Sequence, residues 1–144
     1  MIDLKQHPII QQYIAWNAFG DLLDMDFQIL AKGEVRYTMP VKEKHLATPL
    51  ASHGGAIAAL LDAALGVSCL TMVCEQGNIV STVSLTVNYL SPGKMGDNLI
   101  ALAKVVKAGK RILYTECELT NQDGTLIARA SATMNAYPAE KVAR

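Results

Sequence analysis

Residues 53–74 read HGGAIAALLDAALGVSCLTMVC, a stretch rich in Ala and Leu that contains no proline and a single carboxylate. When this stretch is wound as a helix, apolar side chains fall on nearly every face, which is typical of a helix buried on all sides. Gly77 follows as a stop signal. The pattern predicts one long central helix from Gly54 to about Cys74, roughly 30 Å in length.

The sequence before this helix predicts a short helix and a β-hairpin. Pro8 opens the helical pattern and Gly20 ends it, and we interpret this helix as one that packs on the rest of the fold. Residues 22–41 then predict two strands joined by a turn at Lys32-Gly33. The residues that share one face of the short helix are Ile10, Tyr13, Ile14 and Asn17.

Four further strands are predicted after the long helix. Apolar and polar residues alternate over 82–89, and further strand patterns lie at 98–107, at 112–120 and from Leu126 onwards. Turn sequences separate them at residues 91–94, 107–110 and 121–124. Because strands joined by short turns pair antiparallel, we expect an α+β protein in which an antiparallel β-sheet curls around one buried helix.

The composition bounds the class of protein. The 144 residues suffice for one domain with its own core, and we expect a single domain over residues 1–144. With 13 Lys and Arg against 13 Asp and Glu, the chain lacks the basic excess of a nucleic-acid-binding protein. We interpret the apolar runs as too short to span a bilayer, which takes roughly 18–20 residues, and expect no membrane partner.

The expected compartment is the cytoplasm. The N-terminus has no charged start followed by an apolar block, so we expect no signal peptide. Cys69, Cys74 and Cys117 are odd in number and lie in apolar surroundings. This pattern indicates buried thiols in a reducing compartment.

Asp62 is the carboxylate of the predicted central helix. Burying a carboxylate is costly unless it is paired or functional, and its helical neighbours Ala58, Ala59, Leu65 and Gly66 include no cation. Small residues around it leave room for another backbone or a ligand. Two interpretations stay equally open here: a structural Asp that is hydrogen-bonded across a helix interface, or a functional carboxylate.

His53, Gly54 and Gly55 lie at the start of the same helix. Two glycines at a helix N-terminus leave free N–H groups and room for close approach, which suits an oxyanion or a polarised carbonyl. A flexible helix start with a capping residue is the commoner explanation for this motif taken alone. Together with Asp62, however, the motif supplies the two parts that are needed to attack an acyl carbonyl.

The spacing of Gly54 and Asp62 predicts an assembly. The two residues are eight positions apart, which is roughly 12 Å along a straight helix. One carbonyl carbon cannot lie about 3–3.5 Å from a nucleophile on Asp62 and also accept a hydrogen bond from Gly54 of the same chain. If both act on one substrate, they come from two subunits whose long helices lie side by side and antiparallel. The distance also excludes His53 and Asp62 as neighbours in a serine-hydrolase triad.

Four cations surround one predicted hairpin turn: Lys104, Lys107, Lys110 and Arg111. A solvated turn is the usual explanation, and a phosphate site beside Gly109 is the functional one. The three His residues have no metal-ligand spacing to one another or to the cysteines, so we expect no metal site.

These motifs together resemble the hotdog-fold acyl-CoA thioesterases, in the branch of the phenylacetate-pathway thioesterases and their animal relatives. The resemblance covers about residues 20–137. The His-Gly-Gly…Asp spacing, combined with the Tyr-Leu-x-Pro strand end, is its specific part. It rests on His53-Gly54-Gly55, Asp62, Gly66, the strand end Val87-Asn88-Tyr89-Leu90-Ser91-Pro92-Gly93, Gly96-Asp97, the Gly109-Lys110 hairpin and the Asn121–Gly124 turn.

The resemblance implies roles at the matching positions. Asp62 would be the nucleophile or the general base that activates water, and the Gly54 N–H of the partner subunit would polarise the thioester carbonyl. His53 would shape that turn, and Thr82 would orient the attacking water. The residues implied in substrate binding are Gly55, Thr48, Tyr89, Pro92, Gly93, Lys107, Lys110 and Arg111, with the CoA nucleotide near the Pro92-Gly93 turn and the lysine-rich hairpin.

The resemblance also implies an assembly and a substrate. The subunits would form a homodimer and, as two dimers, a homotetramer, with CoA entering only as part of the substrate and no separate cofactor. Hydrolysis of acyl-CoA is the activity implied, and a hotdog hydratase or dehydratase, or a non-catalytic acyl-CoA- or lipid-binding protein, is the alternative. The aromatic content of 6% favours aliphatic or unselective acyl groups.

One position departs from the family's pattern. Many members carry Asn or Gln six residues before the His, whereas this chain has Ala47 there, with Thr48 next to it. Either Thr48 substitutes for the amide or carbonyl activation rests on Gly54 alone. Losing one such donor in an acyl-transfer site typically costs on the order of 10²-fold in rate.

Overall fold

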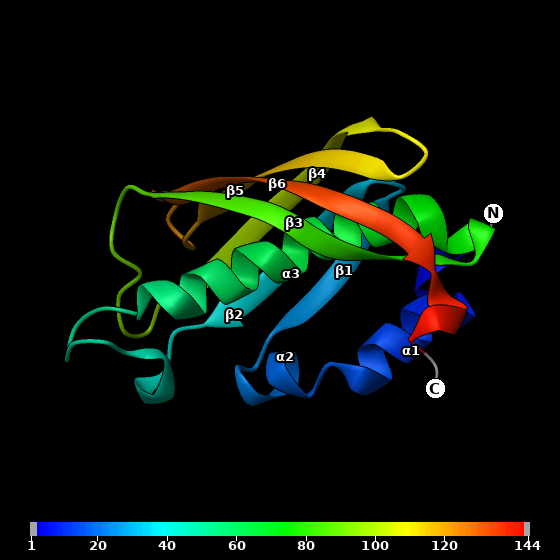
Figure 1. Cartoon of the computed structure of the whole chain (residues 1–144). Coiled ribbons are helices and arrows are strands. Elements are labelled where there is room, and N and C mark those ends of the chain that lie inside the picture. Colours follow the sequence, from blue (N-terminus) through cyan, green and yellow to red (C-terminus); the bar gives the residue numbers. More distant parts are fainter. Residues whose placement is uncertain (1–2, 143–144) are drawn as a thin grey trace.

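Six antiparallel strands form one sheet in the computed structural model of the chain, which describes residues 3–142 (Figure 1). The strand order is β1-β2-β4-β5-β6-β3, so β1 and β3 are the two edges. The strands are β1 (Asp26–Ala31), β2 (Glu34–Pro40), β3 (Asn78–Tyr89), β4 (Asn98–Ala108), β5 (Ile112–Thr120) and β6 (Leu126–Pro138). Hairpins join most neighbours, and β3 pairs with β6 along its whole length.

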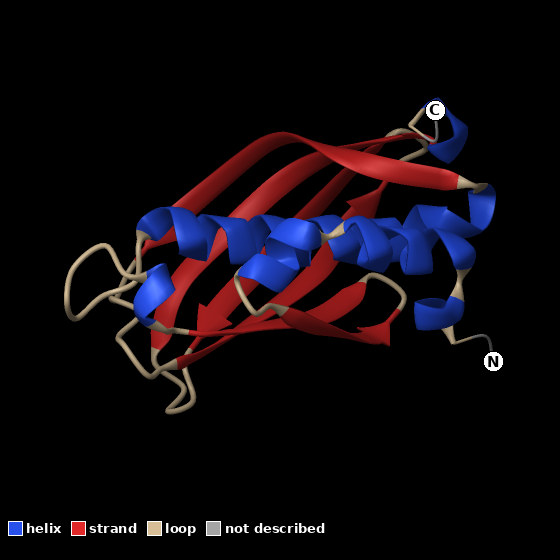
Figure 2. Cartoon of the chain, turned by 90° about the horizontal axis from the view of Figure 1, so that it is seen from below, coloured by secondary structure: helices blue, strands red, loops and turns tan. Residues whose placement is uncertain are grey.

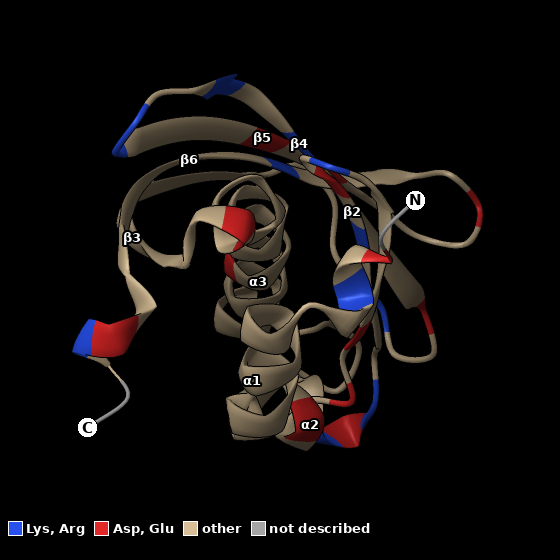
Figure 3. Ribbon diagram, turned by 90° about the vertical axis from the view of Figure 1, so that its right-hand side faces the viewer, with Lys and Arg blue, Asp and Glu red and all other residues tan. Residues whose placement is uncertain are grey.

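Helix α3 (Gly54–Val73) is the predicted central helix and lies against one face of this sheet (Figure 2). Viewed along α3, the sheet curls over the helix (Figure 3). Leu60, Leu61 and Leu65 are fully buried between helix and sheet, and burial of each such side chain contributes about 1.5–3 kcal/mol. The predicted hotdog fold, an antiparallel sheet around one long helix, is confirmed.

The expectation that the apolar runs are too short to span a bilayer is wrong. Residues Gly54–Gln76 form a helical stretch whose most apolar 18-residue window has a mean hydropathy of 2.0, and by length and composition this stretch could cross a membrane. The prediction rested on uninterrupted apolar runs, and Asp62 interrupts this one. The mean hydropathy over 18 residues stays high in spite of that single charge. In the fold, 67% of the most apolar window is buried, so most of the apolar surface of this helix is covered by the rest of the chain.

Two hydroxyl groups fix α3 against the sheet. Ser68 shares a hydrogen bond of 2.8 Å with Thr115 of β5 and donates to the carbonyl of Leu65. Thr71 accepts a hydrogen bond of 2.8 Å from the backbone N–H of Gly33, in the turn between β1 and β2. Buried hydroxyls that are satisfied in this way specify one register of helix on sheet, and that register positions Asp62.

The N-terminal segment forms two helices where one was predicted. α1 (Pro8–Trp16) ends where Asn17 leaves helical geometry, and α2 (Ala18–Leu22) begins there with the Asn17 side chain as its cap. Gly20 lies inside α2 and does not end a helix. α1 covers the side of α3 that faces away from the sheet (Figure 3). Short 3₁₀ helices lie at Leu4–Gln6, Glu43–His45, Cys74–Gln76 and Ala139–Lys141.

The strand boundaries follow the predicted turns, except that the first strand begins at Asp26 and not at residue 22, which lies in α2. The register is irregular within β3. β3 begins at Asn78, earlier than the alternating pattern indicated, and its register with β6 shifts between Thr82 and Ser84. The shift leaves Val83 63% exposed. The turn at Lys32-Gly33 and the strand over 112–120 lie where they were predicted.

Candidate active site

Asp62 lies midway along α3, half-buried, beside a cavity of about 420 Å³. Its Oδ1 accepts a hydrogen bond of 2.7 Å from the hydroxyl of Thr82 on β3. None of the ion pairs formed within residues 3–142 includes Asp62. The carboxylate is therefore neither free in bulk solvent nor neutralised by a basic group, and it faces space that a ligand can fill.

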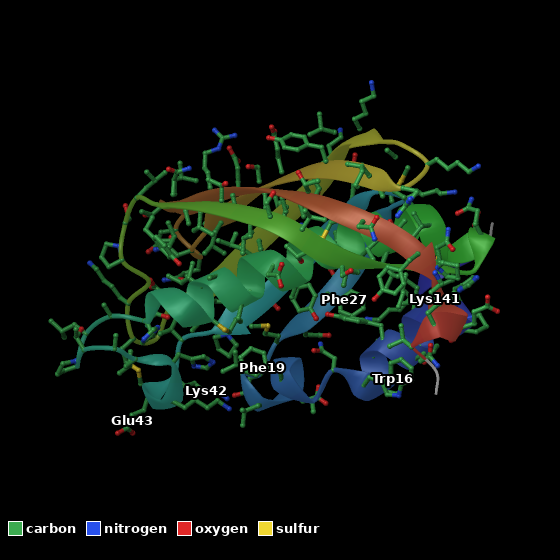
Figure 4. All side chains as sticks on the ribbon, viewed as in Figure 1. Trp16, Phe19, Phe27, Lys42, Glu43 and Lys141 are labelled. Carbon is green, nitrogen blue, oxygen red and sulfur yellow. The ribbon has the colours of Figure 1, made fainter. Side chains whose placement is uncertain are left out.

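The cavity is walled by α1 and α2 on one side, by α3 on another and by β3 on a third. Figure 4 labels Trp16 on α1 and Phe19 on α2, both of which line it. Its volume falls within the roughly 300–1,000 Å³ of small-molecule sites. The lining residues are Ile9, Gln12, Tyr13, Trp16, Asn17, Phe19, Ala59, Asp62, Ala63, Gly66, Val67, Leu70, Ile79, Val80, Ser81, Thr82, Met134 and Val142. This predominantly apolar lining suits the hydrocarbon part of a substrate.

The N-terminus of α3 presents a free backbone donor. The Nδ1 atom of His53 caps the helix by accepting a hydrogen bond of 2.8 Å from the N–H of Gly55. In the part of the chain that the structure describes, the Gly54 N–H has no acceptor. The first N–H groups of a helix carry partial positive charge, so Gly54 can donate to an oxyanion while His53 holds the turn.

Gly54 opens onto a second, separate groove of about 340 Å³. The hydroxyl of Tyr89 donates a hydrogen bond of 2.9 Å to the Gly54 carbonyl. Pro92 and Gly93 line the same groove. The structure thus brings four predicted residues together at the N-terminal end of α3: Gly54, Tyr89, Pro92 and Gly93. Asp62 and Thr82 line the 420 Å³ cavity instead, and Asp62 is about 12 Å along the helix from Gly54.

The basic hairpin lies at the opposite end of the sheet from the Pro92-Gly93 turn. β4 starts just after that turn and ends at the hairpin that carries Lys107, Lys110 and Arg111, the blue tip in Figure 3. Eleven residues of strand separate the two, which is roughly 35 Å. A single chain therefore does not bring together the two regions that the resemblance implies lie near the CoA nucleotide, because an extended strand cannot bring its own two ends together.

Thr48 belongs to a turn away from the Asp62 cavity. Its Oγ1 accepts hydrogen bonds from the N–H groups of Leu50 at 3.4 Å and Ala51 at 3.1 Å. Ala47 donates its N–H to the Ala51 carbonyl in the same turn. Within one chain, the Thr48 hydroxyl stabilises this turn and does not line the cavity beside Asp62.

Sequence reasoning missed a polar cluster at the cavity wall. The hydroxyls of Tyr13 and Tyr37 are 2.9 Å apart, and Asn17 Nδ2 donates to the Tyr37 hydroxyl at 3.0 Å. Burial raises the pKa of both phenols above the ordinary value, so both stay neutral at physiological pH. Tyr13 and Asn17 were recognised as sharing a helix face, but no signal in the sequence indicated that this face meets Tyr37 and Asp62.

Within residues 3–142, no group of three His, Cys, Asp or Glu side chains lies close enough together to hold a metal ion. Cys69, Cys74 and Cys117 are buried free thiols, as predicted.

Comparison with known proteins identifies the family. A profile of the thioesterase superfamily matches residues 52–128. Acyl-coenzyme A thioesterase 13 of Homo sapiens is 35% identical over 105 residues, which are 72% of this chain and 73% of that protein. The solved structure of the PaaI protein from the phenylacetic acid degradation operon of E. coli has a TM-score of 0.85 at 24% identity, over 94% of both chains, which shows the same fold.

A Streptococcus mutans protein solved with acetyl-CoA bound has a TM-score of 0.70 and 30% identity, over 79% of this chain and 89% of that one. The segment matched by the family profile contains both parts of the site, the Gly54 helix start and the Asp62–Thr82 pair. The chain therefore belongs to the thioesterase superfamily and is a thioester hydrolase.

Proposed function

We propose that this protein hydrolyses acyl-CoA to a free acid and CoA, with Asp62 as its catalytic carboxylate. The observation that carries the proposal is the Asp62 carboxylate, which forms no ion pair with residues 3–142. It accepts a hydrogen bond of 2.7 Å from Thr82 beside an apolar cavity. Relatives named acyl-CoA thioesterases and a 30% identical structure that holds acetyl-CoA support the substrate class. The lining of the cavity favours aliphatic or unselective acyl groups.

The reaction needs a carboxylate and a carbonyl-polarising donor. Water adds to the acyl carbon, the C–S bond breaks, and the proton lost by the water passes to the thiolate of CoA. Asp62 acts either as the base that takes this proton or as the nucleophile that forms an anhydride for water to cleave. The Gly54 N–H stabilises the developing oxyanion, and a thiolate leaves readily near neutral pH, so no strong acid, metal or separate cofactor is required.

Two subunits complete each site in this proposal. Gly54 and Asp62 open onto different spaces of one chain, so an antiparallel pair of α3 helices is needed to bring the Gly54 of one subunit to the Asp62 of the other. β3 is a 12-residue edge strand, and an unpaired edge is a template for pairing with a second copy. The same arrangement carries the basic hairpin of one subunit towards the Pro92-Gly93 turn of the other. We further propose that two such dimers form a homotetramer and that the enzyme works in the cytoplasm.

The proposal is tested by mixing the purified protein with a panel of acyl-CoA esters and a thiol reagent. Wild type is expected to release free CoA, and Asp62→Asn to release it at least about 100-fold more slowly with an unchanged melting temperature. Asn is the matched replacement, because its amide oxygen can still accept the hydrogen bond from Thr82. An Asp62→Asn variant with wild-type activity would contradict the catalytic role.

The same panel separates the alternatives. Tight binding of acyl-CoA without thiol release would indicate a binding protein. Reversible addition of water to an enoyl-CoA, again without thiol release, would indicate a hydratase.

A further inference from the structure

The side chain of Asn17 has one orientation. Its Oδ1 accepts a hydrogen bond of 3.2 Å from the backbone N–H of Gly20, and its Nδ2 donates to the phenol oxygen of Tyr37 at 3.0 Å. Turning the amide round would place Nδ2 against an N–H donor, so the cap of α2 fixes which end faces Tyr37. Asn17 is therefore a hydrogen-bond donor to Tyr37.

This donation sets the direction of the next hydrogen bond. Tyr37 is 1% exposed, and within residues 3–142 the other polar partner of its hydroxyl is Tyr13, at 2.9 Å. A phenol carries one proton, and a buried donor left without an acceptor is unfavourable. Tyr37 therefore donates to Tyr13. The Tyr13 oxygen is an acceptor in this bond, and its own proton stays available for a partner in the cavity.

Tyr13 and Asp62 line the same cavity, and they are its two titratable residues among those described. Burial, together with the charge of Asp62, raises the pKa of the Tyr13 phenol, so it keeps its proton at neutral pH. Thr82 occupies Oδ1 of Asp62. No other hydrogen bond to the carboxylate is formed within the described chain, so Oδ2 is left for water or substrate.

We propose that Tyr13 is a further hydrogen-bond donor of the active site, whose proton the Asn17 and Tyr37 hydrogen bonds leave free to hold the water that the Asp62 carboxylate deprotonates. The water oxygen accepts from Tyr13, one water proton points to Oδ2 of Asp62, and a lone pair remains for the acyl carbon. When the O–C bond forms, the proton moves to Asp62, and it passes to the CoA thiolate when the C–S bond breaks. Tyr13 keeps its proton throughout. The inference rests on the proposed acyl-CoA hydrolysis, with Asp62 acting as base.

Two matched deletions of a hydroxyl test the proposal. Tyr13→Phe removes the cavity donor, and we expect kcat for acyl-CoA to fall about 10-fold or more, with KM within about twofold. It should also lower the melting temperature, because the buried Tyr37 hydroxyl loses its acceptor. Tyr37→Phe removes a buried hydroxyl that forms two hydrogen bonds. It should lower the melting temperature, while kcat stays above about a third of the wild-type value because Tyr13 still has its proton.

The relative loss of kcat in the two variants decides between the proposal and a purely structural role. If the tyrosine pair were only structural, the more buried Tyr37 would be the more damaging site, and Tyr37→Phe would lower kcat at least as much as Tyr13→Phe. That result, or a Tyr13→Phe variant with wild-type kcat, would overturn the proposal. A failure of the proposed function looks different: wild type would release no CoA from any ester of the panel, which would remove both proposals together.

Discussion

Thr82 has a single proton and two acceptors within reach. Its Oγ1 lies 2.7 Å from Asp62 Oδ1 and 3.4 Å from the sulfur of Met134. Because a charged carboxylate is a far stronger acceptor than a thioether, the proton goes to Asp62. Thr82 thereby fixes the rotamer of the carboxylate and leaves its second oxygen facing the cavity.

Replacing Thr82 separates this positioning role from packing. Thr82→Val keeps the shape of the side chain and removes the donor, so kcat for acyl-CoA should fall by about 10-fold while the melting temperature changes little. Thr82→Ser restores the hydroxyl and should recover most of the loss. Steady-state kinetics on one acyl-CoA checks both variants. A Thr82→Val enzyme as fast as wild type would show that Asp62 needs no such anchor.

The buried thiols give a prediction about chemical reactivity. Burial raises the pKa of Cys69 to about 11 and that of Cys117 to about 12. At pH 8 a thiol with a pKa of about 11 is ionised to about one part in a thousand. The native protein should therefore leave a chromogenic thiol reagent unreacted at pH 8, and it should react once denaturant unfolds it. Rapid labelling of the native protein at pH 8 would contradict the burial of these residues.

The same shifts set the sign of the alkaline pH dependence. The folded state keeps these thiols protonated above the pH at which they ionise in the unfolded chain, so it binds more protons there and loses stability as pH rises. The melting temperature should fall between about pH 8.5 and pH 11, and calorimetry over that range checks the direction.

Single residues could be predicted where they contrast with their surroundings. Asp62 stands out because it is a lone carboxylate in an Ala- and Leu-rich helix, and Gly54 because two glycines begin that helix. Tyr13 and Tyr37 do not stand out, because each fits an ordinary packing position in its own element. Their significance arises from contact between α1 and β2, which sequence spacing does not encode.

At the scale of the element, the start of α3 depends on a cap made by His53. Its Nδ1 satisfies the Gly55 N–H at 2.8 Å, which leaves the neighbouring Gly54 N–H as the free donor. Loss of a helix N-cap costs about 0.5–2 kcal/mol of stability. The capping role of His53 and the free direction of the Gly54 N–H, the proposed oxyanion donor, are thus two consequences of one hydrogen bond.

His53 variants test whether capping is its whole contribution. His53→Ala should lower the free energy of unfolding by about 1 kcal/mol and reduce kcat, because the Gly54 N–H loses its fixed direction. His53→Asn supplies another good capping oxygen and should recover both quantities. Urea unfolding and steady-state kinetics measure them separately. If His53→Asn were stable yet inactive, the imidazole would have a chemical role beyond the cap.

Element boundaries could be predicted only where the chain marks them locally. Gly33 and Gly77 both adopt positive φ, at 83° and 76°, and each lies at a turn or helix end that the sequence indicated. The break at Asn17 has no Gly or Pro beside it, and Ala18 and Phe19 continue the helical pattern up to Gly20, where the sequence indicated its end. The irregularity at Val83 is hidden for a similar reason: the alternation of side chains runs through it unchanged, whereas the pairing with β6 shifts.

At the scale of the whole molecule, the sheet holds apart two regions that are proposed to bind the same CoA ester. The groove at Gly54 and the basic hairpin lie at opposite ends of β4. Spacing along the sequence predicted that one chain cannot join Gly54 to Asp62, but it did not show that the hairpin lies at the other end of the sheet from the Pro92-Gly93 turn. That relation depends on strand direction, which becomes visible only in the assembled sheet.

The hairpin makes a prediction about the nucleotide of CoA. Replacing Lys107, Lys110 and Arg111 by Gln should raise KM for acyl-CoA by about 10-fold, since phosphate contacts in solvent are of modest strength, and should leave KM for short thioesters without a nucleotide nearly unchanged. Steady-state kinetics on the two substrate types is the measurement. Equal effects on both would argue against a phosphate-binding role.

A test of the two-subunit site needs a variant that lacks only the Gly54 N–H. Gly54→Pro provides it, because proline is favoured at the first position of a helix and removes that donor. His53 already has the extended backbone, φ −61° and ψ 133°, that a residue before proline requires. A Cβ at position 54 would meet the Tyr89 ring at 3.5 Å, an ordinary contact. Gly54→Ala keeps the N–H and is the matched control.

Mixing two inactive variants then shows which chains build a site. Asp62→Asn and Gly54→Pro should each be nearly inactive alone, and Gly54→Ala should keep most of its activity. In a mixed dimer, the Asp62 of the Gly54→Pro subunit meets the intact Gly54 of the Asp62→Asn subunit, so one of the two sites is complete. Since random assortment makes half of the dimers mixed, co-expressed or co-refolded chains should recover about 25% of wild-type activity. Had each chain carried a complete site of its own, mixing would restore nothing, because every chain in the mixture lacks either its carboxylate or its donor.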